Sequence, residues 1–362
     1  MMRVGLIIYG SLDTISGGYL YDRKLVEHLR ECGDEVEVIS MRWRSYPGCL
    51  AYNLSQGLYS RVRGLRLDIM LQDELNHPSL FWLNRRLGVR PIISIVHHLR
   101  SSERRPRWRN LFYRWVEARY LRSVDGFVFN SETTRAEVEK LLEKPTQSVV
   151  ASPGGDRFTI GLTPAQVEAR ALAPGPLRIL FLGNVIPRKE LHTLITALSL
   201  LPAPEGGREE WRLDVVGSLS ADAAYAKSIR GQISHLGLEE KVALRGILDE
   251  GPLTECLSQS HLVAVPSTYE GFGIAYLEGM GFGLPAIATT AGAAREIIED
   301  EGTGFLVPPG DAEALAARIA RLSRDRKLLA RMGQAAMKSF AAHPTWRDTT
   351  SSIRRFLCTV AG

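Results

Sequence analysis

Short apolar runs alternate with amphipathic segments along the whole of this 362-residue chain, and this alternation constrains the fold more than any other feature. Several runs are apolar almost throughout, as in 92–96 and 262–265, which is typical of strands covered on both faces. Segments with helical spacing lie between most of the runs, which predicts an α/β fold of parallel sheets joined by right-handed helical crossovers. The apolar runs are 3–9, 35–39, 67–71, 91–96, 126–129, 148–151, 177–182, 212–216, 241–245, 261–265, 285–289 and 304–307.

Chain length and one break in the alternation predict two domains. The segment 159–176 contains Pro164, Pro174 and Pro176 and has no long apolar run, so it is expected to be a linker. A last helical segment follows a second break at Pro344, and it can pack back on the N-terminal domain. The expected organisation is an N-terminal domain at 1–158, a linker at 159–176, a C-terminal domain at 177–342 and a terminal helix at 343–362.

Charge is unevenly distributed between the two halves of the chain. Residues 1–150 carry 23 Lys and Arg against 17 Asp and Glu, whereas the remainder carries 22 against 23. A basic half indicates an anionic partner, which can be nucleic acid, anionic lipid or a phosphorylated substrate. The four cysteines are far apart in sequence, so neither a zinc site nor a disulfide framework is predicted, and a reduced, cytoplasmic protein is expected.

The segment 266–283 is the strongest candidate for a functional motif. It follows a buried strand and opens a helix, where Gly271 and Gly273 would let backbone N–H groups approach a phosphate. Glu270 and Glu278 are eight residues apart, which is roughly 12 Å along a helix. One carboxylate could then bind a sugar and the other a ribose, with a diphosphate between them. The alternative is a helix start that packs closely on a sheet and carries one solvated glutamate.

The run from Tyr269 to Gly273, together with Glu278, resembles the Glu-x7-Glu motif of retaining family-4 glycosyltransferases. Segments 16–18, 153–158, 181–189, 284–288 and 304–311 resemble other elements of that family, in the same order along the chain. The resemblance implies a GT-B fold, in which two Rossmann-like domains face a central cleft. It also implies transfer of a sugar, with retention of configuration, from a UDP- or GDP-linked donor to a hydroxyl of a polysaccharide, glycolipid or small molecule. No cofactor and no metal are expected.

The resemblance assigns the donor-binding roles residue by residue. Arg188 and Lys189 match the basic pair that binds the donor diphosphate, and they would stabilise the charge of the departing group without a metal. Glu278 matches the residue that holds the ribose hydroxyls, and Glu270 the residue near the sugar hydroxyls. The remaining donor contacts, in part through the backbone, are assigned to Gly17, Gly18, Gly246, Ile247, Gly271, Phe272 and Gly273.

His97 ends an apolar strand where the family has a histidine that faces the donor sugar, and His98 is the second candidate for this position. With Arg188, Lys189 and Glu270, His97 is expected to be catalytic. It would orient the sugar and stabilise positive charge at C1, while the departing phosphate accepts the proton of the acceptor. One departure from the family is Asn184, where many members have arginine, so one phosphate contact would be weaker or rebuilt.

The segment 99–122 is strongly basic and also carries an apolar stripe at helical spacing, formed by Trp108, Leu111, Phe112 and Trp115. A basic helix with aromatic anchors can lie in a membrane interface. In the other interpretation, the stripe packs on its own sheet and the arginines are solvated. An anionic or lipid-linked acceptor would use this charge, with Arg104, Arg105 and Arg107 as candidates, at the inner face of a membrane. Nucleic acid is not expected, because no nucleic-acid-binding motif accompanies the charge.

Other classes of function can be compared with this assignment. A nicotinamide-dependent oxidoreductase needs Gly-x-Gly-x-x-Gly after its first strand, and the chain lacks it. A GT-B sugar-nucleotide epimerase and a catalytically silent sugar-nucleotide-binding protein share more of the pattern. The spacing of Glu270 and Glu278 argues against the first, and the intact Arg188 and Lys189 argue against the second.

Overall fold

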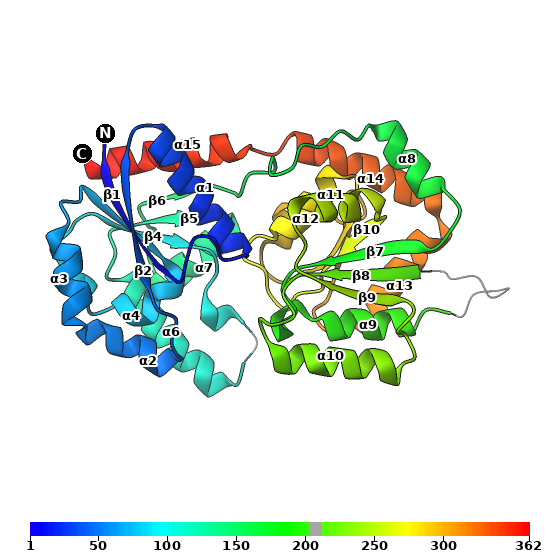
Figure 1. Ribbon diagram of the computed structural model, residues 1–362, viewed down its shortest axis with the longest axis horizontal. Helices are drawn as coiled ribbons and strands as arrows, with labels where there is room; N and C mark the ends of the chain where they lie inside the picture. The colour runs from blue at the N-terminus through cyan, green and yellow to red at the C-terminus, as the bar shows by residue number, and fades with distance from the viewer. Residues whose placement is uncertain (104, 203–210) are drawn as a thin grey trace. The chain divides into compact units, whose positions relative to one another are not determined.

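The computed structural model describes residues 1–103, 105–202 and 211–362, and its contacts divide the chain into two compact units. Unit 1 comprises Met1–Gly154 and Pro344–Gly362, and unit 2 comprises Gly155–His343. Each unit has its own parallel sheet with helices packed around it (Figure 1). The α/β fold of parallel sheets, predicted from the alternation of apolar runs, is confirmed, and so are the two Rossmann-like domains that the family resemblance implies.

In the described part of unit 1, six parallel strands form one sheet in the order β2-β1-β3-β4-β5-β6. The order changes direction between β1 and β3, because β2 lies on one side of β1 and β3 on the other. Such a switch point is where ligands bind in open α/β sheets, beyond the carboxyl ends of the strands. The strands are β1 (Arg3–Tyr9), β2 (Glu35–Met41), β3 (Ile69–Asp73), β4 (Ile92–Val96), β5 (Gly126–Phe129) and β6 (Ser148–Val150).

The helices of unit 1 begin at residues that satisfy free backbone N–H groups. Ser16 caps the first helix by accepting from the N–H of Tyr19, and Ser131 caps α7 in the same way through Thr134. The α-helices are α1 (Gly17–Glu31), α2 (Tyr46–Leu50), α3 (Gln56–Gly64), α4 (His77–Leu80), α5 (Asn84–Leu87), α6 (Arg107–Leu121), α7 (Glu132–Leu142) and α15 (Trp346–Ala361). The short 3-10 helices are η1 (Ala51–Leu54), η2 (Glu74–Asn76) and η3 (Arg100–Ser102).

Unit 2 repeats this plan with the strand order β12-β11-β10-β7-β8-β9 in its described residues. Its switch point lies between β7 and β10, which are hydrogen-bonded neighbours. The strands are β7 (Leu177–Leu182), β8 (Trp211–Val216), β9 (Val242–Gly246), β10 (Leu262–Ala264), β11 (Ala286–Thr289) and β12 (Gly304–Val307). The helices are α8 (Pro164–Leu172), η4 (Pro187–Lys189), α9 (Leu191–Ser199), α10 (Ala223–His235), α11 (Glu250–Gln259), α12 (Ile274–Gly281), η5 (Ala293–Glu296), α13 (Ala312–Arg324) and α14 (Arg326–Ala341).

The segment 159–176, expected to be a linker, contains helix α8 and belongs to unit 2. Thr163 and Gln166 form a capping box, and Pro164 occupies the first helical turn, where its missing N–H needs no partner. Val167 is buried against Gly283 and Gly333. The chain therefore passes between the units at Gly154 and Gly155 and again at His343 and Pro344.

The terminal helix α15 packs against α1 and β6 in unit 1, so the two chain ends lie close together (Figure 1). Thr345 and Asp348 form a capping box at its start. Arg354 donates to the buried carboxylate of Asp34 at 2.7 Å, and Thr349 donates to the Ser152 carbonyl at 2.6 Å. None of the described helices has the length and apolar character needed to cross a membrane.

Candidate functional site

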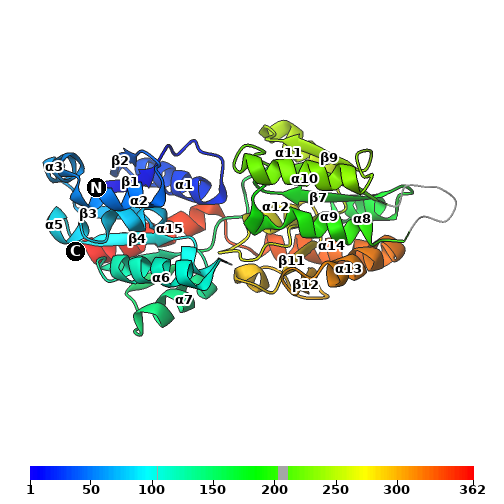
Figure 2. The same cartoon turned by 90° about the horizontal axis from the view of Figure 1, so that it is seen from below.

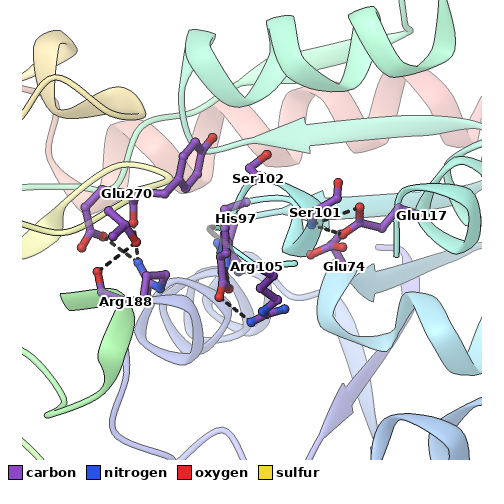
Figure 3. Close-up of polar contacts among 12 residues, drawn as sticks. Glu74, His97, Ser101, Ser102, Arg105, Glu117, Arg188 and Glu270 are labelled. Atoms are coloured by element: carbon purple, nitrogen blue, oxygen red, sulfur yellow. Dashed lines mark hydrogen bonds and ion pairs between the residues drawn. The ribbon is translucent and has the colours of Figure 1, made fainter. Parts of the chain in front are cut away.

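The turns after β7 and β10 bring two cations and a carboxylate together at the switch point of unit 2. Arg188 and Lys189 lie in η4, directly before α9, and Glu270 lies in the turn before α12. The Lys189 Nζ is 2.5 Å from the Glu270 Oε1, and the Arg188 guanidinium is 3.5 Å from the Glu270 Oε2. Arg188 also donates to the Tyr269 carbonyl at 2.7 Å (Figure 3). The backbone of the two turns is joined as well, because the Thr268 N–H donates to the Arg188 carbonyl.

Glu270 is ionised in spite of its burial. Burial raises the pKa of Glu270, but the charges of Lys189 and Arg188 and the hydrogen bonds from Lys189 and Ser267 outweigh burial and lower the pKa to about 2. Burial in turn lowers the pKa of Lys189 from its ordinary value. Two cations face one carboxylate, so the cluster keeps one net positive charge. Such a cluster is suited to an anionic ligand.

The backbone before α12 forms a tight turn that only glycine can adopt at one position. Gly273 has a φ of 108°, a conformation that other residues rarely adopt. A Cβ built there would clash with the ring of Tyr276, so only glycine fits. Gly271 and Phe272 precede it and are buried, and the Phe272 ring packs against His343. The predicted position of these residues at the start of a helix therefore agrees with the structure.

Glu278 lies inside α12, only 6% exposed, and pairs with Arg157 at 2.7 Å. Burial raises the pKa of Glu278, and Arg157 counteracts part of that rise. Sequence reasoning placed Arg157 in a family-like loop but assigned it no role. A ribose at Glu278 would share the carboxylate with this guanidinium.

Gly246 and Ile247, predicted to lie near the nucleotide base, come at the end of β9 in unit 2. Gly246 has a φ of 70°, and its carbonyl accepts from the Gly217 N–H at 2.8 Å. The Ile247 side chain is 49% exposed, so it offers an apolar surface to a ligand. Asn184, where many family members have arginine, accepts from the Ser218 N–H at 3.2 Å and so stabilises the neighbouring turn.

In unit 1, Gly17 and Gly18 start α1 at the other switch point, and His97 follows β4. A Cβ on Gly18 would lie 3.2 Å from the His97 ring, which is a tight contact. The His97 Nε2 is 3.5 Å from the Oδ1 of Asp22, whose side chain is fully buried. Neither carboxylate oxygen of Asp22 has a hydrogen-bond donor among the described residues. The ring of Tyr21 contacts His97 edge-on.

The acidic surroundings of His97 decide its protonation. Burial lowers the pKa of His97, but the interaction with Asp22 and the negative charges of Asp22, Asp73 and Glu74 outweigh it and raise the pKa to about 8. Asp73 ends β3, and burial together with Asp22 raises its pKa to about 8. A protonated His97 can donate to a sugar or phosphate oxygen. The other part of its expected role, stabilising positive charge at C1, stays a prediction.

His98 and the buried residues around Glu74 lie next to this site, and they contact other side chains. His98 pairs with Glu103 at 3.2 Å. Glu74 contacts the ring of His77, and Glu117 accepts from the Ser101 N–H at 3.2 Å (Figure 3). Burial raises the pKa of both Glu74 and Glu117 to about 7 and lowers the pKa of His77 to about 4.

Two groups of side chains could hold a metal ion among the described residues, and both lie in unit 1. One is Asp22, Asp73 and His97, and the other is Glu74, His77 and Glu117. Sequence reasoning missed the first group, although an acid on the apolar face of α1 was a visible signal. His261, interpreted as structural, bonds to the backbone of Arg178 and Arg170 within unit 2.

The models of two protein families match the chain. The model of the glycosyl transferases group 1 matches residues 164–339, and that of the glycosyl transferase 4-like domain matches residues 21–154. Together the two matches cover most of the chain, so the chain belongs to the GT4-type glycosyltransferases of the GT-B fold. The family predicted from the motif around Glu270 is therefore confirmed.

Sequence relatives of this transferase include enzymes of several actinobacteria. It is 29% identical to the D-inositol 3-phosphate glycosyltransferase of Kineococcus radiotolerans over 236 residues, 61% of this chain and 54% of the relative. It is 25% identical to the phosphatidyl-myo-inositol mannosyltransferase of Mycobacterium leprae over 395 residues, 99% of this chain and 97% of the relative. The alignment thus spans little more than half of the first relative and nearly all of the second.

Solved structures confirm the fold of the transferase. The sucrose-phosphate synthase of Thermosynechococcus elongatus superposes with a TM-score of 0.81 at 20% identity, covering 99% of both chains. HepE of Anabaena, in complex with UDP and glucose, superposes with a TM-score of 0.77 at 20% identity, covering 99% of this chain and 100% of HepE.

Proposed function

We propose that this glycosyltransferase moves a sugar from a UDP- or GDP-linked donor to a hydroxyl acceptor, with retention of configuration and without a divalent metal. The observation that carries the proposal is the cluster of Arg188, Lys189 and Glu270 at the switch point of unit 2. Its net positive charge would bind the diphosphate, and Glu270 would accept from sugar hydroxyls. The complexes of HepE with UDP and with UDP-glucose support a nucleotide-sugar donor.

The charges in the site support a transfer in which the departing phosphate takes the acceptor's proton. The acceptor oxygen bonds to C1 as the C1–O bond to the phosphate breaks, and the electron pair of that bond stays on the phosphate. Glu270, with a pKa of about 2, is a weak base. His97, with a pKa of about 8, already carries its proton at neutral pH. Neither group is suited to remove the acceptor's proton, so the departing phosphate is the better base.

Metal independence is supported by the cations at the diphosphate position. Arg188 and Lys189 would neutralise the departing group, which is the role of a metal in other transferases. The described residues of unit 2 contain no group of three carboxylates or imidazoles close enough to bind an ion. In unit 1, Asp22, Asp73 and His97 are a possible metal site, so the proposal needs a direct test.

The acceptor is proposed to be a sugar or a lipid-linked or anionic compound, and helix α6 is proposed to contact a membrane surface. Trp108, Leu111, Phe112 and Trp115 are 43–68% exposed, so the interpretation in which this stripe packs on its own sheet is wrong. Helix α6 contains one acidic residue, Glu117, and its side chain is buried. The names of the relatives that act on inositol 3-phosphate and phosphatidyl-myo-inositol support an acceptor of this kind.

Incubation with a panel of UDP- and GDP-linked sugars in EDTA tests the proposal. Slow release of the nucleoside diphosphate without an acceptor is expected, because water can replace the acceptor hydroxyl. Appearance of an epimerised sugar nucleotide would show an epimerase. Binding without turnover of any donor would show a silent binding protein, and activity that returns only with Mn²⁺ would contradict metal independence.

A further inference from the structure

Unit 1 contains a pocket that the proposed donor chemistry does not use. It has a volume of about 420 Å³ and lies between the loop after β4, helix α6 and helix α7. These two helices lie next to each other (Figure 2). The pocket is large enough for a small molecule or a headgroup and too small for a folded partner.

One face of each helix lines the pocket. Arg107, Asn110, Leu111 and Arg114 of α6 recur at the spacing of one helical face. Glu137, Lys140 and Leu141 do the same on α7. Leu99, Ser101, Ser102 and Arg105 complete the lining from the loop. This loop begins two residues after His97, so the pocket opens at the same carboxyl edge of the sheet as the candidate catalytic histidine.

The pocket is strongly cationic. Arg107, Arg114 and Lys140 are exposed, and no carboxylate among the described residues pairs with them. Arg105 pairs with Glu103 through one nitrogen, whereas its Nη1 is buried without an acceptor among the described residues. The acidic lining residue, Glu137, accepts a hydrogen bond from Ser102 at 2.7 Å. Four cations and one carboxylate therefore line the pocket, and a second carboxylate, Glu103, pairs with Arg105, so positive charge is in excess.

This arrangement fits a phosphate better than a carboxylate. Several arginine forks that line one pocket match the oxygens of a phosphate and its charge of about −2. The buried Leu99 and Leu141 and the exposed Leu111 give the pocket an apolar side. A ligand that joins a phosphate to a carbon skeleton satisfies both features. Arg104, a sequence-based candidate for contact with the acceptor, lies outside the described residues.

We propose that this pocket binds a phosphate group of the acceptor, which Arg105, Arg107, Arg114 and Lys140 hold against α6 and α7. The inference rests on the proposed function, because it assigns an acceptor class to the transferase. The phosphate can belong to a lipid headgroup or to a soluble phosphorylated sugar, and the chemistry of the pocket is the same for both.

Titration of the full chain, followed by backbone amide NMR shifts, tests the proposal. The probes are glycerol 3-phosphate and monomeric dihexanoyl phosphatidylglycerol, each at a constant ionic strength near 0.15 M so that surface charges are screened. Saturable shifts are expected around 99–114 and 137–141. Arg107→Ala/Arg114→Ala/Lys140→Ala should weaken binding by at least about tenfold, which is one decade in Kd.

The matched control removes the same charge from unit 1 elsewhere. Arg42, Arg66 and Arg355 are also exposed and lack a carboxylate partner among the described residues. Arg42→Ala/Arg66→Ala/Arg355→Ala should bind both probes like the wild type. Tighter binding of the lipid identifies a headgroup, and equal binding of the two probes identifies a soluble phosphate. Both outcomes support the site.

The proposal is overturned if neither probe shifts the pocket residues, or if the pocket variant binds as tightly as the wild type. UDP and GDP, added to the same sample, report on the donor site around Lys189. If a nucleoside diphosphate shifts those residues while the phosphate probes shift nothing, the pocket assignment fails and the proposed function stands. If neither nucleotide binds, the proposed function fails as well.

Discussion

Glu270 and Glu278 belong to one turn and helix, yet their pKa values shift in opposite directions. Both are buried, and burial raises the pKa of each. Glu270 has two cations and a serine hydroxyl around it, and these reverse the effect of burial. Glu278 has a single guanidinium, which reduces the rise without reversing it. The number of cationic partners therefore decides the direction in which the pKa of each carboxylate shifts.

At Lys189, loss of the ammonium group should slow turnover as well as weaken binding of the diphosphate. Lys189→Ala is expected to lower kcat about 10²-fold or more, since it removes a group that stabilises the charge of the departing diphosphate. Turnover of the donor is measured by release of the nucleoside diphosphate. Lys227→Ala, which removes an exposed lysine of α10, should leave turnover unchanged.

Glu278→Ala should act more on binding than on turnover. It is expected to weaken nucleotide affinity by about tenfold or more, the scale of a lost bidentate contact, with a smaller effect on kcat. Arg157→Ala leaves the buried carboxylate unpaired and should also reduce the free energy of unfolding, by about 1–3 kcal/mol. Small and equal effects of Lys189→Ala and Glu278→Ala on turnover would show that the donor binds elsewhere.

Asp22 should control the protonation of His97. Asp22→Asn removes the negative charge nearest the ring, so the pKa of His97 should fall from about 8 toward its ordinary value of 6.5. Asp73 and Glu74 remain, and they limit the fall. The pKa is measured from the imidazole NMR signals as a function of pH. An unchanged His97 pKa would contradict the role of Asp22.

The sign of the accompanying stability change follows from linkage. The pKa of His97 is higher in the folded chain than in the unfolded chain, so the ion pair stabilises the fold fully below about pH 6.5. That contribution is lost as the pH rises through about 8.

Asp34→Asn is the control for Asp22→Asn. Asp34 is equally buried but pairs with Arg354, so its replacement should not change the pKa of His97.

At the scale of the element, helix α6 has three faces with different surroundings. One is buried through Val116, Tyr120 and Leu121, one lines the cationic pocket, and the third exposes the aromatic stripe. Arg119 lies over the Trp115 ring at 4.1 Å, which places a cation beside an exposed aromatic side chain. Tryptophan beside arginine is typical of helices that lie in a membrane interface.

Sedimentation with vesicles tests the outward face of α6. Trp108→Ala/Trp115→Ala should partition into phosphatidylglycerol vesicles on the order of tenfold more weakly than the wild type, because two interfacial anchors are lost. Trp43→Ala, which removes another exposed tryptophan of unit 1, should have no effect. A wild-type chain that stays in the supernatant at low salt would overturn the membrane contact.

Most helices and strands could be predicted from the sequence, but helix α8 could not. The buried strands are short apolar runs, and their period is visible without a structure. In α8, Pro164 suggested a break, but proline at the first helical turn supports a helix when a threonine caps it. The signal was the Thr163–Gln166 pair, three residues apart.

At the scale of the whole molecule, the sequence predicted two α/β sheets and the family. Resemblance to the family also assigned Arg188, Lys189 and Glu270 to one donor site, and the structure brings these three side chains together although 81 positions separate Lys189 from Glu270. The partners Asp22 and Arg157 were missed, since each meets its target across a long stretch of chain. The Asp22–His97 pair is separated by 75 positions, and no local pattern records such a pairing.

Nucleoside diphosphate binding, measured by calorimetry in EDTA, tests the central claim most directly. The claim is that the cations at the switch point of unit 2 take the place of a metal. UDP or GDP should bind the wild type with the same affinity in EDTA and in Mn²⁺, and Lys189→Ala should weaken that binding while Lys227→Ala does not. Binding that requires Mn²⁺, or that is indifferent to the loss of Lys189, would contradict the claim.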